Sequence, residues 1–392
     1  MILTKNIFFK NFLKKTNTKK ARIALKDTLQ NKTEVLRSLT TDYDYSYSKK
    51  KINILKNKIS TVNLIGMGGS ILGTKAIYKF LNHKIKKKVS FYDNLIPKVK
   101  NVHKTKKNLN LIVSKSGNTL ETISNTNILI KKKDNNIFLV QNNENYLKKL
   151  AEKMKADVID HNNFIGGRYS VLSEVGMLPA SLMGLQEQKF KQFNYLVKNK
   201  KFMNSLISNV SSIIFYLKKK RFNSIILNYD ESSDDLFRWY QQLVGESLGK
   251  QQKGIFPYIS TMPKDNHSLM QLYLDGPKNS FFTFFNVKDK ISNKIKNYSL
   301  LDSQKFLKNK SFSQILNAQR ISAEKVFRLK KIPFRSFQIL NKNEEVLGEL
   351  FSFFILETIL LGKLLKINPY DQPAVEAIKI NTKKILKNSN YQ

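Results

Sequence analysis

A stretch from Leu236 to Gly249 has the apolar spacing of an amphipathic helix that ends on glycine. Glu246 stands in its last turn, and Gln242 lies four residues earlier, on the same helix face. A substrate lying against that face would meet both side chains. A glutamate on a helix is by itself more often a solvated surface charge. With suitable neighbours, however, Glu246 is a candidate proton-transfer base.

Three further side chains have types suited to proton transfer or to stabilising negative charge. Arg168 follows two glycines, which allow close approach of the backbone, and it is either an electrophilic stabiliser or an ordinary surface arginine. His267 follows Asp265-Asn266 at the expected start of a helix, where a lone histidine is more often structural or exposed. Lys379 lies in a lysine-rich C-terminal helix, where solvation is the ordinary interpretation. None of the three identifies a site alone.

A glycine-rich turn, Gly66–Gly73, separates an apolar run from an expected helix. In the dinucleotide-binding motif G-x-G-x-x-G, the third glycine would fall on Ile71, so the spacing excludes a nicotinamide-binding turn. A Walker motif is also excluded, because no lysine follows the turn at the required position. Backbone N–H groups at such a turn favour an anion, which makes Gly69 and Ser70 candidate ligand contacts. A simple tight turn is the alternative.

The second turn gathers hydroxyl groups and a lysine between a strand and a helix: Ser114, Lys115, Ser116 and Thr119. Helix capping by Thr119 with Thr122 is the alternative explanation. Because the donors outnumber what one cap requires, the turn predicts a bound phosphomonoester.

Short apolar runs alternate with amphipathic stretches, a pattern typical of parallel sheets covered by helices. The expected strands are 62–65, 109–113, 136–140 and 156–159, then 224–227, 280–285 and 326–329. Helices are expected at 345–365 and 372–386. We therefore predict two tandem α/β three-layer sandwich domains with mostly parallel sheets, namely residues 51–195 and 196–392, after an N-terminal arm and linker over residues 1–50.

Composition excludes several classes of protein. With 392 residues, 41% of them hydrophobic, the chain is long enough for two globular cores. The absence of cysteine excludes disulfides and thiolate chemistry and suits a cytoplasmic setting. The net charge of +40 would by itself suggest binding to nucleic acid or to a membrane surface. However, the lysines are spread along the whole chain, which favours a solvated basic surface without such a partner. The apolar run 347–365 carries Glu349, Glu357 and Lys363, so we expect a buried helix and no membrane segment.

Taken together, the motifs resemble glucose-6-phosphate isomerases, in order along residues 60–380. The resemblance is carried by Gly66-Met67-Gly68-Gly69-Ser70, Ser114–Thr119, Gly166–Ser170, Gly245–Lys250, His267-Ser268 and the segment Gln372–Lys379.

The resemblance implies an aldose-ketose isomerase of glycolysis and gluconeogenesis that needs no metal or cofactor. The resemblance also implies that His267 and Lys379 open the sugar ring. Glu246 would then move a proton between C1 and C2 through a cis-enediolate. Arg168 would stabilise the developing negative charge of the enediolate, and Gln242 would be a nearby hydrogen-bonding partner. The resemblance also implies a homodimer in which His267 acts in the partner's active site.

Two alternatives stay open. A bifunctional phosphoglucose/phosphomannose isomerase would also accept mannose 6-phosphate, which the size of Gln242 disfavours. A non-catalytic sugar-phosphate sensor would keep the turn at 114–119 but would not need Glu246, His267, Arg168 and Lys379 together.

Overall fold

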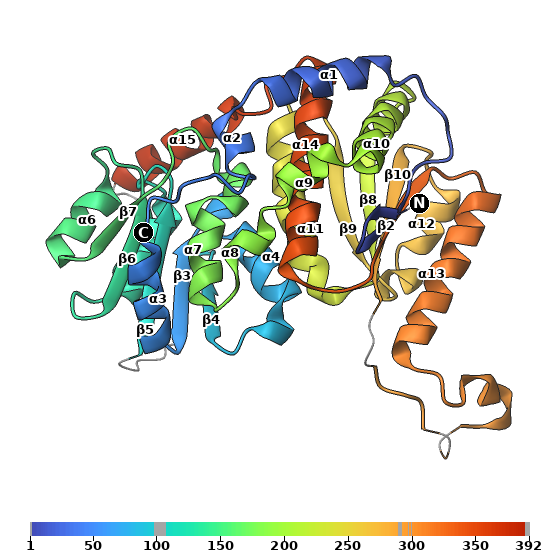
Figure 1. Ribbon diagram of the computed structural model, residues 1–392, viewed down its shortest axis with the longest axis horizontal. Coiled ribbons are helices and arrows are strands. Elements are labelled where there is room, and N and C mark those ends of the chain that lie inside the picture. Colours follow the sequence, from blue (N-terminus) through green and yellow to red (C-terminus); the bar gives the residue numbers. More distant parts are fainter. Residues whose placement is uncertain (1, 98–106, 289–291, 297, 299, 389–392) are drawn as a thin grey trace.

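The computed structural model describes the chain apart from residues 1, 98–106, 289–291, 297, 299 and 389–392. Two sheets lie side by side, each with helices on both faces (Figure 1). Their central strands are parallel. The predicted α/β architecture with mostly parallel sheets is thus confirmed.

The first sheet is wholly parallel and has the strand order β4-β3-β5-β6-β7. Its strands are β3 (Thr61–Gly66), β4 (Lys88–Tyr92), β5 (Asn108–Ser114), β6 (Asn135–Val140) and β7 (Asp157–Asp160). Four of them fall where apolar runs predicted strands. The exception is β4, an edge strand whose five residues are half-buried or exposed, so no apolar run marked it.

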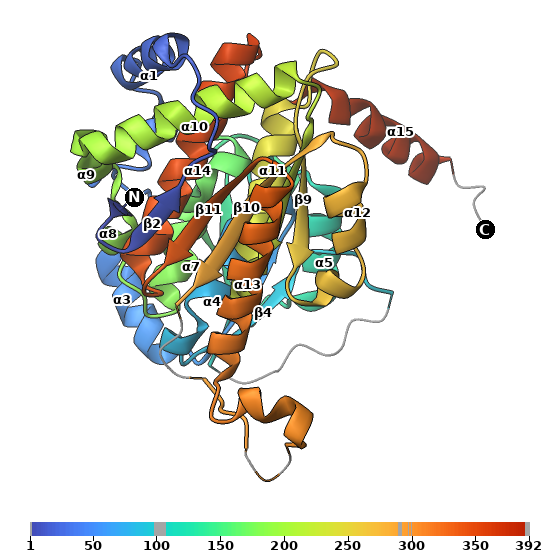
Figure 2. The same ribbon diagram turned by 90° about the vertical axis from the view of Figure 1, so that its right-hand side faces the viewer.

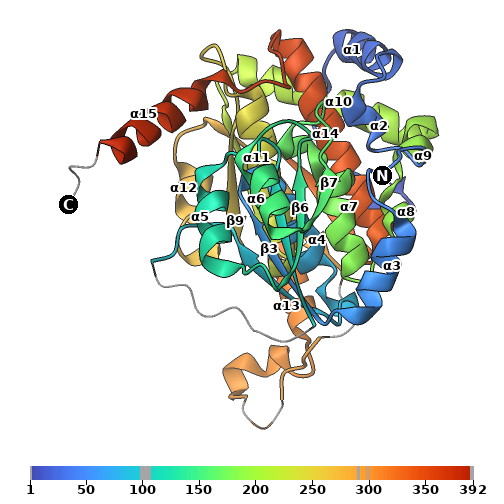
Figure 3. The ribbon, with the colours of Figure 1, turned by 90° about the vertical axis from the view of Figure 1, so that its left-hand side faces the viewer.

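Alternate residues of this sheet face two separate groups of helices. Leu64, Leu111 and Leu139 pack toward α3 (Lys49–Lys58) and α7 (Glu174–Leu182). Ile65, Ile112 and Phe138 pack with residues of α6 (Tyr146–Met154) and with residues around α5 (Leu120–Leu129). Figure 3 shows α5 and α6 covering the outer face. Burial on both faces explains why these strands are almost continuously apolar.

The second sheet has the order β1-β2-β11-β10-β8-β9. Its four parallel strands are β8 (Asn223–Asn228), β9 (Phe256–Thr261), β10 (Ser280–Val287) and β11 (Phe334–Ile339). Phe281 and Phe285 face one core, whereas Phe282 and Phe284 face another beside α12 (Met270–Asp275) and α13 (Phe312–Leu329). Figure 2 shows these two helices over the outer face.

Two strands within residues 2–10 belong to this second sheet, although we expected these residues within an N-terminal arm. β2 (Ile7–Lys10) pairs antiparallel with β11, and β1 (Ile2–Thr4) pairs antiparallel with β2. Ile7 and Phe9 are buried in the main core. Both strands are short, and β2 pairs with β11 more than 300 residues away, so local pattern could not assign them.

The expected strand at 326–329 is wrong. These residues form the last turn of α13, and the strand follows at β11. Helical periodicity explains the difference, because Arg320, Glu324 and Phe327 are buried whereas Leu329 is 73% exposed. The segment buries one helix face rather than alternate residues.

The helices between the sheets share one large core. α4 (Leu72–Phe80) packs against α11 (Asp234–Leu248), which also contacts α14 (Glu344–Leu365). The prediction of a buried helix at 345–365 is confirmed, and no described helix has the length and apolarity to cross a membrane. The remaining helices are α1 (Lys19–Gln30), α2 (Glu34–Arg37), α8 (Glu187–Phe190), α9 (Phe193–Lys198), α10 (Lys200–Lys218) and α15 (Glu376–Lys387).

Candidate active site

Arg168 is the centre of the site between the two sheets. It lies in the turn Gly167–Leu172, is only 2% exposed, and its backbone oxygen accepts a bond from the indole of Trp239. All five guanidinium N–H groups have acceptors. These are Oε2 of Glu246 at 3.2 Å, Oε1 of Gln372 at 2.6 Å, Oγ of Ser247 at 2.8 Å, and the backbone oxygens of Pro369 and Asp371 at 2.8 and 2.9 Å. The guanidinium is therefore fixed in one orientation.

Glu246 projects from the last turn of α11 and is 30% exposed at its side chain. Oε2 accepts from Arg168, and Oε1 accepts from Nε2 of Gln242 at 2.9 Å. The predicted grouping of Glu246, Gln242 and Arg168 is therefore observed. The carboxylate is held from two sides while part of it stays open to a substrate.

The glycine turn packs directly against both partners of Glu246. A Cβ on Gly69 would lie 2.2 Å from the carbonyl carbon of Gly167 and 2.5 Å from the nitrogen of Arg168. Gly68 has φ 56°, and a Cβ there would lie 2.8 Å from Nε2 of Gln242. Ser70 is buried in the same turn. Glycine is required here because two backbones touch.

The turn after β5 holds the hydroxyl groups that predicted a phosphate site. Oγ of Ser114 lies 3.2 Å from Oγ1 of Thr119, and Oγ of Ser116 accepts from the nitrogen of Asn118 at 3.3 Å. The side chain of Thr119 makes no cap bond to α5, so helix capping does not account for this threonine. Its hydroxyl remains suited to a ligand.

Lys115 adds positive charge to this turn. Its pKa is lowered by burial and further by the nearby charge of Arg168. The positive charge of Arg168 near that of Lys115 favours an anion between them. This electrostatic pattern supports the expectation of a phosphate group.

His161 was not among the expected site residues, yet it lies fully buried just after β7. Nδ1 lies 3.0 Å from the backbone oxygen of Asn162, so that nitrogen carries the proton. Burial, together with the charge of Lys115, lowers the pKa of His161 to about 4. Ser247 and Gln372, which bond to Arg168, stand within motifs quoted above, whereas no motif marked His161.

His267 and Lys379 lie apart from this group. His267 ends the short turn Lys264–His267 and is exposed, and no hydrogen bond or ion pair joins it to Glu246 or Arg168 among the described residues. Lys379 lies on α15, which extends away from the body of the molecule (Figures 2 and 3). Its Nζ contacts Glu376 of the same helix at 3.3 Å. Within one chain, therefore, Glu246, Gln242 and Arg168 lie together, whereas His267 and Lys379 do not join them.

Solved structures establish the class of fold. A hypothetical protein from Thermus thermophilus superposes with a TM-score of 0.79 at 22% identity, covering 94% of each chain. A glucose-6-phosphate isomerase from Chlamydia trachomatis superposes with a TM-score of 0.74 at 18% identity, covering 95% of this chain and 85% of the other. The architecture is that of the tandem α/β sugar isomerases.

Sequence comparisons narrow the class to one family. The phosphoglucose isomerase family model matches residues 25–261. A glucose-6-phosphate isomerase of Methanocaldococcus jannaschii is 31% identical over 353 residues, covering 86% of each chain. Another from Mycoplasmopsis synoviae is 30% identical, covering 88% of this chain and 87% of its own. The chain belongs to the phosphoglucose isomerase family.

Proposed function

We propose that this enzyme interconverts glucose 6-phosphate and fructose 6-phosphate, with Glu246 as the proton-transfer base. The observation that carries the proposal is the pairing of Glu246 with the fully bonded guanidinium of Arg168. A base held in one position beside a fixed positive charge suits a reaction whose intermediate is an anion.

The proposed reaction is a proton transfer between two carbon atoms of the substrate. Glu246 removes the proton from C2 of the open-chain aldose, a C1–C2 double bond forms, and negative charge develops on the oxygen at C1. The hydroxyl at C2 then gives its proton to the oxygen at C1, and return of the carbon-bound proton to C1 gives the ketose. C1 is thus reduced as C2 is oxidised, and no external oxidant is needed. Arg168 stabilises the enediolate, and Gln242 orients the carboxylate through Oε1.

The phosphate of the substrate would bind to the turn after β5. We assign this contact to Ser114, Lys115, Ser116 and Thr119, with the amides around Gly69 and Ser70 on the neighbouring turn. The raised positive potential from Lys115 and Arg168 supports the assignment. Anchoring the phosphate positions C1 and C2 over Glu246.

Ring opening is assigned to His267 and Lys379, which requires a second chain. His267 is exposed at the end of its turn, consistent with a histidine that acts in a partner's active site. α15 has exposed apolar residues, including Ile378 at 70% and Leu386 at 64%, and none of its residues is buried. We therefore propose a homodimer, active in the cytoplasm in glycolysis and gluconeogenesis.

The test is conversion of fructose 6-phosphate to glucose 6-phosphate by purified protein in the presence of a metal chelator. We expect turnover by the natural sequence and a loss of about 10² to 10⁴ in kcat for Glu246→Gln. Glu144→Gln, at an exposed glutamate, is the matched control and should retain full activity. Unimpaired turnover by Glu246→Gln contradicts the assignment, and equal turnover of mannose 6-phosphate would favour the bifunctional alternative.

A further inference from the structure

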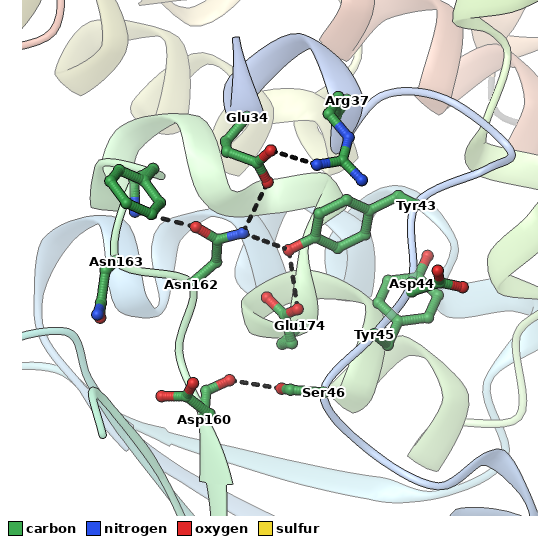
Figure 4. Close-up of a pocket in the computed structure, with 11 residues that line it drawn as sticks. Glu34, Arg37, Tyr43, Asp44, Tyr45, Ser46, Asp160, Asn162, Asn163 and Glu174 are labelled. Carbon is green, nitrogen blue, oxygen red and sulfur yellow. Dashed lines mark hydrogen bonds and ion pairs between the residues drawn. The ribbon is translucent and has the colours of Figure 1, made fainter.

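A second cavity of about 620 Å³ lies between the N-terminal segment and the loop after β7. α2, the loop Tyr43–Ser46, the loop Asp160–Phe164 and the start of α7 line it (Figure 4). No residue of the candidate active site belongs to this lining. The volume falls within the range of small-molecule sites.

The cavity is acidic in a chain whose net charge is +40. Glu34, Asp44, Asp160 and Glu174 contribute four carboxylates, against the single guanidinium of Arg37. Arg37 is already paired with Oε1 of Glu34 at 2.5 Å. The local field therefore attracts cations although the rest of the molecule repels them.

A chain of hydrogen bonds fixes the inner wall of this cavity (Figure 4). Nδ2 of Asn162 donates to Oε2 of Glu34 at 3.0 Å and to the hydroxyl oxygen of Tyr43 at 3.3 Å. That hydroxyl donates to Oε1 of Glu174 at 2.8 Å. The carboxylates of Glu34 and Glu174 are thus held in place, whereas those of Asp44 and Asp160 are exposed.

Glu174 ends this chain with an incomplete set of partners. The residue is 2% exposed, and its Oε2 is buried with no hydrogen-bond partner among the described residues. Burial raises the pKa of Glu174. A buried carboxylate of this kind is stabilised by a nearby positive charge, even one that does not touch it.

Lys191 is a buried cation whose charge acts on Glu174, but its hydrogen bonds go to backbone oxygens. The ammonium of Lys191 donates to the backbone oxygens of Ser38 and Leu172. It lies 5.0 Å from the ring centroids of both Tyr43 and Tyr45. Burial lowers the pKa of Lys191 to about 7, so it carries only part of a charge near neutral pH. Among the described residues, Lys191 makes no ion pair within 4.0 Å with a carboxylate of the cavity.

The arrangement of the carboxylates favours an extended organic cation. Figure 4 shows Glu34 and Asp160 at opposite ends of the cavity, with Glu174 between them. No group of three or more histidine, aspartate or glutamate side chains among the described residues is arranged to hold a metal ion. Tyr45 and Phe164 add aromatic surface, and Phe164 is 80% exposed. Aromatic faces attract both ammonium groups and methylene chains.

We propose that this cavity binds a linear aliphatic polyamine, with separate ammonium groups at the carboxylates and the methylene chain along Tyr45 and Phe164. The site is distinct from the isomerase site and does not depend on the roles proposed there.

Titration calorimetry with spermine tests the proposal on the full-length protein. We expect saturable binding near one spermine per chain, weakened by added salt. The double variant Asp44→Asn/Asp160→Asn changes two exposed carboxylates and should lower the affinity about fivefold or more. The double variant Glu144→Gln/Asp302→Asn makes the same change of net charge at exposed positions elsewhere and should bind as the natural sequence does.

Retained isomerase activity in both double variants would show that they are folded. The proposal is overturned if the natural sequence shows no saturable binding at about 10 mM spermine, a limit near 3 kcal/mol of binding free energy. It is also overturned if both double variants lose affinity equally, because binding would then follow net charge alone. Displacement of spermine by magnesium chloride at equal concentration would identify a site for any cation and would likewise overturn it.

Discussion

Nη1 of Arg168 lies 3.2 Å from Oε2 of Glu246 and also donates to Oε1 of Gln372 at 2.6 Å. These partners are 78 and 204 positions away in the sequence. One buried nitrogen thereby joins the turn after the first sheet, the end of α11 and the segment before α15. Movement of any one of these segments would alter the position of the carboxylate.

Arg168→Lys should lower kcat about 10² to 10³-fold and lower the melting temperature. Lysine has one nitrogen and cannot reproduce the forked contacts of a guanidinium, so Glu246 loses a fixed partner. Steady-state kinetics and thermal unfolding measure the two effects. Arg238→Lys, at an exposed arginine on the same helix as Glu246, is the control and should change neither. A wild-type kcat in Arg168→Lys would contradict the role of the guanidinium.

Lys115→Met should weaken phosphate binding more than it slows chemistry. A hydrogen bond to a charged group contributes about 1.5 to 3 kcal/mol, so KM for fructose 6-phosphate should rise about 10- to 100-fold. Inhibition by inorganic phosphate should weaken in parallel. Lys132→Met, at an exposed lysine, should leave both constants unchanged. A lower kcat with an unchanged KM would place Lys115 in the chemical step instead.

Gly69→Ala should destabilise the fold and abolish most activity. The added Cβ would lie 2.2 Å from the carbonyl carbon of Gly167, so the turn before Arg168 has to move. A Cβ on Gly245 meets nothing within 4 Å, and Gly245→Ala in α11 should instead stabilise the protein by about 0.5 to 1 kcal/mol. Denaturant unfolding of both variants distinguishes close packing from a general effect of removing glycine. Equal stability of the two variants would show that the backbone contact is unimportant.

Mixing two inactive variants tests the proposed action of His267 in the partner's site. His267→Ala and Glu246→Gln should each be inactive as homodimers. After unfolding and refolding together, the mixture should recover about a quarter of wild-type activity, because half of the dimers are mixed and each has one intact site. Light scattering confirms the dimer. Absence of recovery in a proven mixed dimer would mean that both residues act within one chain.

Glu349→Gln should stabilise the protein above about pH 7. Glu349 is buried on α14 and accepts a bond from the hydroxyl of Thr4 at 2.7 Å, and burial raises its pKa to about 7. The folded protein therefore binds a proton that the unfolded chain releases at lower pH, and stability falls as the pH rises from about 4.5 to 7.

Glutamine keeps the acceptor for Thr4 without the charge, so the gain should be roughly 2 to 3 kcal/mol at pH 8 and near zero at pH 4.5. Urea unfolding at the two pH values gives the difference. Glu152→Gln, at an exposed glutamate, should show no such dependence on pH. A gain that is equal at both values would point to packing rather than to ionisation.

Local patterns predicted the central strands well. β3, β5, β6, β8 and β10 lie where apolar runs indicated them, because strands buried on both faces leave an apolar run in the sequence itself. The prediction of a strand at the end of α13 was wrong because a four-residue stretch with three apolar residues does not distinguish one helical turn from a strand. β2 was missed since its partner β11 lies at the far end of the chain, and β1 was missed with it because β1 pairs with β2.

The sequence by itself determined the α/β class and the identity of Glu246, Gln242 and Arg168 as candidates, because helix spacing, glycine turns and strand-end hydroxyls are local properties. Only the tertiary structure decided that Arg168 contacts Glu246 and Gln372, and that His267 and Lys379 lie apart from them within one chain. It also decided that four carboxylates from the N-terminal segment, β7 and α7 line one cavity. The reason is that such contacts depend on how buried backbones and helices pack, and residues distant in sequence carry no spacing that records it.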